Sequence, residues 1–254
     1  MTDNGDLGGV KSIDRAFELL EALAAAGGRL SISELVEQSG LPMTTIHRLL
    51  RTLVRSGYVR QEPSKIYTLG PRMIHLGVTA SKLLGSWSRP YLTRIAEATG
   101  ETTSLAVLDA DQVFYVAQVP SRHHLRMTTE AGRRLPPHCT AAGKALLTQA
   151  PDGSVPAALE RMGLARHTTR TITDPAVFLH HLELVRAQGY AVDDGECEVG
   201  VRCLAVPVAG GERAMAISVS APEARFSLGE VATQLPLLQR VAAELAAALA
   251  DPTD

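Results

Sequence analysis

The sequence has no long apolar run and few cysteines. None of its 254 residues falls in a stretch of the roughly 18 apolar residues that a membrane span needs, and the opening MTDNGDLGGV has no basic region or apolar core of a secretion signal. We therefore expect a cytoplasmic protein without a membrane partner. Cys139, Cys197 and Cys203 are odd in number and lack CxxC spacing, which argues against a disulfide framework or a zinc knuckle and favours reduced thiols.

The chain also lacks a strong net charge. A balance of −2 over the whole chain says nothing about a nucleic-acid partner, so the distribution of charge matters. Between Pro42 and Arg72, Glu62 is the only acid, and it stands against the basic residues Arg48, Arg51, Arg55, Arg60, Lys65 and Arg72. With 45% hydrophobic residues the chain is long enough for two domains, and this basic excess belongs to the first of them.

Apolar spacing predicts three helices in the N-terminal third. The first spans residues 12–25, with a stripe expected to face inward that comprises Ile13, Phe17, Leu20 and Leu23 or Ala24. Ser31 and Glu34 form a capping-box pattern at the start of a short second helix, which Gly40 suits as its end. Pro42 fits the first turn of a third helix that Gly57 ends, with apolar residues Ile46, Leu49, Leu50, Leu53 and Val54.

The third helix leaves a polar face to the solvent, made of Thr44, Thr45, His47, Arg48, Arg51 and Arg55. Such residues at the start of a helix that follows another helix and a tight turn are typical of a helix-turn-helix. In that motif the start of the second helix enters the major groove and reads the DNA sequence. The alternative is an ordinary solvated helix face that keeps the domain soluble.

The segment after this helix favours the DNA interpretation. YVRQEPSKIYTLG alternates apolar and polar residues on both sides of a turn-forming EPSK, which predicts a β-hairpin and hence a winged helix-turn-helix. Arg60 and Lys65 on this wing would contact phosphates and position the helix, and such contacts make binding salt dependent.

The N-terminal part of the chain contains the run SIDRAFELLEALAAAGGRLSISELVEQSGLPMTTIHRLLRTLVRSGYV, followed by YTLGPRMIHLG. This part of the chain resembles the N-terminal domain of the IclR family of bacterial transcriptional regulators. The resemblance continues through GETTSLAVLD, LPPHCTAAGKALL, GYAVDDGECEVGVRCLAVPV and AISVSAP, and covers nearly the whole chain. It implies a winged helix-turn-helix joined by a linker helix to a GAF-like domain that binds a small effector, acting as a homodimer or homotetramer on double-stranded operator DNA. Many members have a basic residue where this chain has Met43, which puts one backbone contact in doubt. The expected DNA-binding residues are Met43, Thr44, Thr45, His47, Arg48, Arg51, Arg60 and Lys65.

The rest of the chain predicts a mixed α/β (α+β) fold. Residues 71–84 have enough apolar side chains for a helix that packs on something, and strand-like runs occur at 103–109, 112–119, 201–209 and 214–221. Helices are expected at 90–99, 141–149, 176–188 and 227–249, the last with a Ser227–Glu230 capping box and a kink at Pro236. Strand pairs interleaved with helices suggest a mostly antiparallel sheet. We expect a DNA-binding domain at 1–71, a linker helix at 72–85 and a GAF-like effector domain at 86–254.

HCTAAGKALL contains Gly143–Lys144 but is not a phosphate-binding loop, because His138 stands at the earlier glycine position and Ala145 at the hydroxyl position. A helix start fits better, at which free N–H groups of Ala141 and Ala142 can receive an anion. The alternative is an ordinary helix entry with small residues for close packing.

The resemblance implies further effector-binding residues, namely Asp193, Cys203, Ser218 and Ser220 beside Ala141 and Ala142. Ser218 and Ser220 are two apart on an expected strand, so their hydroxyls point to one face. Leu125 and Met127 would form an apolar wall. Without the resemblance, Cys203 reads as a small buried residue and Asp193 as part of a solvated turn.

Other functions are less well supported. A thiol enzyme with Cys203 as nucleophile, His138 as base and Asp193 as orienter has no supporting spacing, so we expect no enzyme. A redox sensor based on Cys203 or Cys197 is a further alternative. His123, His124 and His138 have no convincing metal spacing, so neither a metal nor a cofactor is expected. The effector is expected to be a small carboxylate, keto acid or ureide, and repression is slightly favoured over activation.

Overall fold

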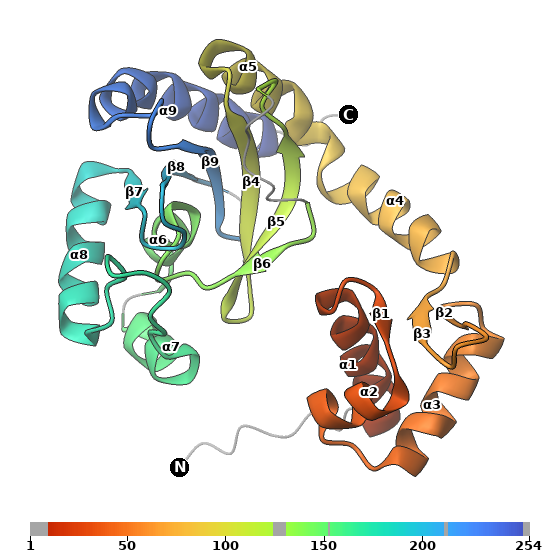
Figure 1. The fold of residues 1–254 in the computed structure, drawn as a ribbon. Helices are drawn as coiled ribbons and strands as arrows, with labels where there is room; N and C mark the ends of the chain where they lie inside the picture. The colour runs from red at the N-terminus through yellow and green to blue at the C-terminus, as the bar shows by residue number, and fades with distance from the viewer. Residues whose placement is uncertain (1–9, 124–130, 152, 211–212, 251–254) are drawn as a thin grey trace. The chain divides into compact units, whose positions relative to one another are not determined.

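The computed structural model describes residues 10–123, 131–151, 153–210 and 213–250, with backbone only at 81–84 (Figure 1). The chain divides into two compact units between Ala80 and Ser81, inside helix α4 (Arg72–Leu84). No helix among the described residues is long and apolar enough to cross a membrane.

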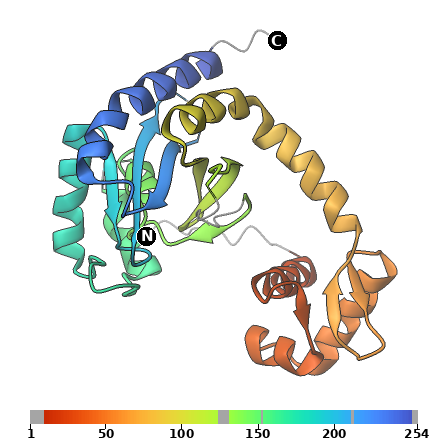
Figure 2. The ribbon, with the colours of Figure 1, turned by 45° about the horizontal axis from the view of Figure 1, so that its top comes forward.

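The N-terminal unit consists of helices around a small sheet (Figure 2). Its helices are α1 (Lys11–Ala25), α2 (Ile32–Ser39), α3 (Met43–Arg55) and the first part of α4. The strands β1 (Arg29–Leu30), β2 (Val59–Gln61) and β3 (Tyr67–Leu69) form an antiparallel sheet in the order β1-β3-β2. The expected helices and hairpin are confirmed, whereas the two-residue β1 is too short to leave a periodic signal.

The start and the end of α2 follow from its sequence. The Ser31 hydroxyl accepts a hydrogen bond from the Glu34 N–H at 3.3 Å, and the Glu34 carboxylate accepts one from the Ser31 N–H at 2.7 Å, so the capping box is confirmed. Gly40 ends the helix at φ 64°, in the left-handed region that glycine adopts without strain. This turn directs the chain into α3.

The expected inward stripe of α1 is only partly correct. Leu19, Leu20 and Leu23 are buried, but Ile13 and Phe17 are 52% and 61% exposed. The predicted apolar stripe and the buried face of α1 share Leu20 and Leu23. The helical period alone therefore could not show which of the two neighbouring faces is buried. Val54 of α3, expected inside, is also 37% exposed.

The second unit is a six-stranded antiparallel sheet covered by helices. The strands are β4 (Thr102–Asp109), β5 (Gln112–Val119), β6 (Arg134–Leu135), β7 (Ala191–Asp194), β8 (Val201–Val208) and β9 (Met215–Pro222), in the order β6-β5-β4-β9-β8-β7. The helices are the 3-10 helix η1 (Ser86–Ser88), α5 (Arg89–Thr99), α6 (Ala141–Leu147), α7 (Ser154–Met162), α8 (Pro175–Gln188) and α9 (Leu228–Ala250).

Two hydrophobic clusters define the two faces of this sheet. α5 and α9 pack on one face through Leu92, Leu238 and Leu245, and α6 packs on the other through Ala141, Ala142 and Leu146 (Figure 1). The four expected strands and four expected helices are present, although α6 ends at Leu147 instead of Gln149, and β6, β7 and α7 were not expected. α9 continues through Pro236, and its Ser227–Glu230 capping box is confirmed.

Gly143 allows α6 to lie against the segment that precedes it. A Cβ atom at this position would stand 2.3 Å from the Pro137 carbonyl oxygen. Because only glycine avoids this clash, the glycine of the GKALL segment is explained by close packing and not by phosphate binding.

Candidate functional sites

The outer face of α3 is hollowed and lined by polar and basic side chains. A hollow of about 790 Å³ is lined by Thr44, His47, Arg48, Arg51, Val54 and Arg55 of α3, with Gln61 and Tyr67 from the hairpin. The inner face of the same helix buries Ile46, Leu49, Leu50 and Leu53 in the core of the N-terminal unit. The core therefore fixes which side of α3 the arginines occupy.

The basic residues of α3 and of the hairpin after it are available to a partner. Among the residues that the structure describes, Arg48, Arg51, Arg55, Arg60 and Lys65 form no ion pair. Glu62, the only acid between positions 42 and 72, is paired with Arg29 of β1 at 2.7 Å. This pair neutralises the one charge that would oppose an anionic ligand.

The wing is a tight hairpin. Its turn is closed by hydrogen bonds from Glu62 N–H to the Ile66 carbonyl at 2.8 Å and from Lys65 N–H to the Glu62 carbonyl at 2.9 Å. Lys65 is exposed and has a left-handed φ of 63°. The expected DNA contacts Met43, Thr45, Arg60 and Lys65 lie outside the lining of the hollow, whereas Arg55, Gln61 and Tyr67, absent from our assignment, line it.

In the second unit, a row of polar residues crosses the sheet on the face that α6 covers. The strand register places Thr102, Ser220, Cys203 and Asp193 opposite one another on β4, β9, β8 and β7. Ser104 and Ser218 are paired in the next row on the same face. Four expected effector residues are thus brought together from three strands, and Thr102 and Ser104 join them.

Three side chains of this face have unusual surroundings. The Ser218 hydroxyl lacks a hydrogen-bond partner among the described residues, and Asp193 and Cys203 have raised pKa values. Ser218 is 2% exposed, and its hydroxyl has no hydrogen-bond partner among the described residues. Asp193 is 1% exposed, and burial raises its pKa to about 7 although its carboxylate accepts a hydrogen bond from the Glu196 N–H at 2.7 Å. Burial also raises the pKa of the Cys203 thiol. An unpartnered buried hydroxyl is costly unless a ligand or a water molecule satisfies it.

A buried ion pair lies beneath this face. Lys144 of α6 is fully buried, pairs with Glu196 and donates to the Val192 carbonyl at 2.7 Å. The sequence contained the signal, since a lysine within an otherwise apolar AAGKALL helix needs a buried anionic partner. The identity of that partner is not readable from the sequence, because Glu196 lies 52 positions away from Lys144.

The remaining residues that the sequence analysis singled out lie in different parts of the second unit or outside the described residues. Ala141 and Ala142 are buried at the start of α6 and belong to the same cluster as Cys203, but α6 has only seven residues and its dipole is correspondingly small. Leu125 and Met127 lie outside the described residues. His138, the base of the alternative thiol-enzyme triad, groups with Cys139 and His167.

The sequence matches two family models in order. The IclR helix-turn-helix domain matches residues 12–63, and the C-terminal domain of the bacterial transcriptional regulator IclR matches residues 78–247. The chain belongs to the IclR family. It is a DNA-binding transcriptional regulator with an effector-binding C-terminal domain, and the family consists of regulators and not of enzymes.

Individual relatives agree over most of their length. The regulator BhcR of Paracoccus denitrificans is 33% identical over 98% of this chain and 91% of its own, and the transcriptional repressor IclR of Escherichia coli is 36% identical over 87% and 83%. The crystal structure of an IclR regulator from Alicyclobacillus acidocaldarius is 28% identical, with a TM-score of 0.84 over 96% of this chain and all of the other. An IclR homologue from Microbacterium hydrocarbonoxydans, complexed with 4-hydroxybenzoate, shares the fold at 23% identity, with a TM-score of 0.78 over 94% of this chain and 98% of its own.

Proposed function

We propose that α3 enters the major groove of an operator, with Thr44, Thr45, His47, Arg48 and Arg51 near base edges and Arg60 and Lys65 on phosphates. The observation that carries this proposal is the hollowed outer face of α3, on which basic side chains have no ion-pair partner among the described residues. The paired state of Glu62 supports it, since the wing then presents only positive charge.

Binding to DNA from the protein's own promoter region tests this proposal. Because contacts of basic side chains with phosphates release counterions, affinity should fall steeply between about 50 and about 200 mM salt. Fluorescence anisotropy with a promoter fragment and a scrambled fragment measures both the salt slope and the preference. An affinity that does not respond to salt, or equal affinity for the two fragments, would contradict the proposal.

We infer that two copies of the chain associate through an apolar groove of the N-terminal unit. This groove, of about 670 Å³, is lined by Ile13, Phe17, Leu20, Leu49, Met73 and Leu76. Three of these lining residues, Ile13, Phe17 and Leu76, are 52%, 61% and 50% exposed. A contiguous exposed apolar surface of this kind is typical of an interface, and two reading helices about 34 Å apart fit two half-sites.

We propose that the effector is a small carboxylate, keto acid or ureide held over the polar row of the sheet. Ser218 and Ser220 would donate hydrogen bonds to it, and the unpartnered Ser218 hydroxyl supports this role. Asp193, whose pKa burial raises to about 7, can donate a hydrogen bond to a carboxylate when protonated, or accept one from an N–H of a ureide when ionised. We propose that the chain represses transcription when it is bound to its operator, as the name of the Escherichia coli relative states for that protein.

A thermal-shift screen of small carboxylates, keto acids and ureides tests the effector site. The variant with both Ser218→Ala and Ser220→Ala should bind promoter DNA as the wild type does but lose the shift given by the best compound. A double variant that still responds at the wild-type concentration of compound would show that the site lies elsewhere.

A further inference from the structure

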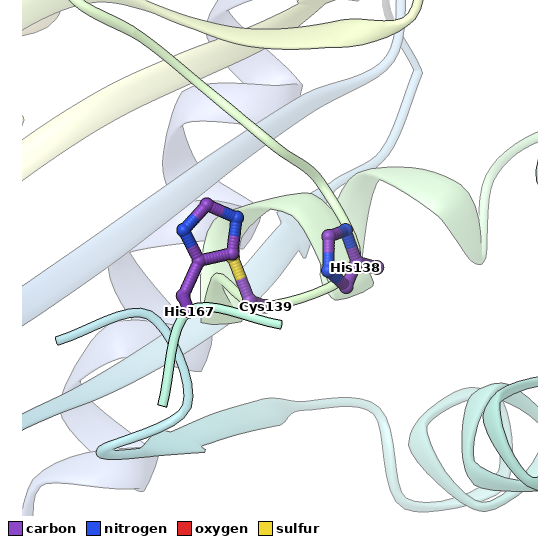
Figure 3. A group of neighbouring side chains, drawn as sticks. All are labelled: His138, Cys139 and His167. Atoms are coloured by element: carbon purple, nitrogen blue, oxygen red, sulfur yellow. The ribbon is translucent and has the colours of Figure 1, made fainter. Parts of the chain in front are cut away.

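A histidine, a cysteine and a second histidine converge beside α6, outside the polar row of the sheet. One ligand atom from each of His138, Cys139 and His167 lies within 4.8 Å of the other two (Figure 3). The rings of His138 and His167 have their centroids 5.8 Å apart and are tilted by 42°. His138 and Cys139 precede α6, and His167 lies between α7 and α8, so two distant segments supply the group.

The hydrogen bonding of His138 leaves one ring nitrogen available. Its Nε2 lies 2.9 Å from the Ala165 carbonyl oxygen, and since a carbonyl only accepts, Nε2 carries the proton. Nδ1 then has a lone pair, is buried, and has no hydrogen-bond partner among the described residues. A histidine that donates one N–H to a backbone carbonyl and presents its other nitrogen is the usual arrangement of a metal-binding imidazole.

The segment that carries His167 is held in place by its neighbours. The His167 N–H donates to the Thr171 hydroxyl at 3.1 Å, and the Thr171 hydroxyl donates to the Glu196 carbonyl at 2.7 Å. Thr168 donates to the Gly195 carbonyl at 2.7 Å. The backbone of His167 is thus fixed while its side chain is exposed, whereas Cys139 and His138 are buried.

We propose that His138 Nδ1, the Cys139 sulfur and the His167 imidazole bind one Zn²⁺ ion, with water in the fourth position. Nitrogen and thiolate donors select zinc over the oxygen-preferring Mg²⁺ and Ca²⁺. Tetrahedral zinc with bonds of about 2.0–2.3 Å sets its ligand atoms about 3.3–3.6 Å apart. The three ligand atoms, which lie within 4.8 Å of one another, would have to move closer to bind the ion. The Cys139 thiol, which donates to the Pro136 carbonyl at 3.7 Å, would release its proton to solvent as the Zn–S bond forms.

The bound ion would join the segment before α6 to the loop between α7 and α8. Neither the spacing of the residues in the chain nor the DNA-binding role predicts this site, because His167 lies far from Cys139 in the sequence. None of the three side chains belongs to the polar row, so the ion and the effector would use different ligand atoms.

Titration of the full chain with Co²⁺ as a spectroscopic substitute tests the site. The chain is first treated with a chelator, and one equivalent of Co²⁺ should then give the absorption of a tetrahedral ion together with a thiolate-to-metal band, both removed by Zn²⁺. His167→Ala should weaken binding by about tenfold or more, and Cys139→Ser should remove the thiolate band.

Two matched variants serve as controls. His180→Ala removes an exposed histidine of α8, and Cys203→Ser alters a thiol of the polar row. Both should bind Co²⁺ as the wild type does. Absence of a tetrahedral spectrum in the wild type, or wild-type affinity in the His167→Ala variant, would overturn the proposal. Since His167 is exposed, its variant remains informative if Cys139→Ser does not fold.

Discussion

Lys144 is a buried cation whose position depends on one carboxylate. Its amine is fully buried and meets Glu196 and the Val192 carbonyl, so the pair is shielded from water and from salt screening. The second oxygen of Glu196 has no hydrogen-bond partner among the described residues, which makes Lys144 its main compensation.

Lys144→Met should lower the free energy of unfolding of the effector domain by about 3–5 kcal/mol, because it leaves the Glu196 carboxylate buried without a partner. Urea unfolding followed by the fluorescence of Trp87, the only tryptophan, measures this loss. The variant with both Lys144→Met and Glu196→Gln removes both charges and should recover much of the stability. Equal stability of the single variant and the wild type would show that the pair contributes nothing.

Asp193 should give the stability of the effector domain a pH dependence of its own. Burial raises its pKa from 3.8 to about 7 in the folded chain. Below about pH 4 the carboxyl is protonated in both states and its stabilising contribution is complete. As the pH rises from about 4 to 7, the unfolded carboxyl ionises while the folded one keeps its proton, so this contribution is lost.

Asp193→Asn removes this titration and keeps an oxygen that accepts the Glu196 N–H. The difference in unfolding free energy between Asp193→Asn and the wild type should therefore shift in favour of the variant as the pH rises from about 4 to 7. Urea midpoints across this range measure it. A difference that is constant with pH would mean that Asp193 ionises normally in the folded chain.

At the scale of the element, α3 and the wing have different proposed tasks. The position of α3 is set by its buried leucines and by the left-handed turn at Gly40, which together hold its polar face outward. The wing places an exposed lysine at the tip of a hydrogen-bonded turn. Base contacts carry specificity, whereas phosphate contacts carry affinity for any sequence.

Thr45→Ala or Arg48→Ala should therefore weaken operator binding by about 1–3 kcal/mol and affect random DNA less. Lys65→Ala should weaken both alike and reduce the salt slope by about one unit. Anisotropy titrations with operator and scrambled fragments compare the three variants. Equal losses on both fragments for all three would remove the specificity assigned to α3.

At the scale of the whole molecule, the proposed association covers the exposed apolar residues of the N-terminal unit. Phe17 and Leu76 line the same groove and are 61% and 50% exposed. A second copy of the chain would cover them and supply the second reading helix.

Phe17→Asp should therefore convert the wild-type oligomer to a smaller species and weaken operator binding at least tenfold, because one copy reaches only one half-site. Sedimentation velocity and anisotropy measure the two effects. Val199→Asp, at a 79% exposed position of the effector domain, is the matched control and should change neither. An unchanged sedimentation coefficient for Phe17→Asp would place the interface elsewhere.

Local patterns of the chain determined the secondary structure and the family. The leucine spacing of α3, the Ser31 and Ser227 capping boxes and the alternating strands are short-range features, so they can be read from neighbouring residues. The tertiary structure decided which apolar residues of α1 are covered, which carboxylate meets Lys144 and which histidines stand beside Cys139. These contacts join residues far apart in the chain, and their distances depend on how the helices and the sheet pack and not on any local periodicity.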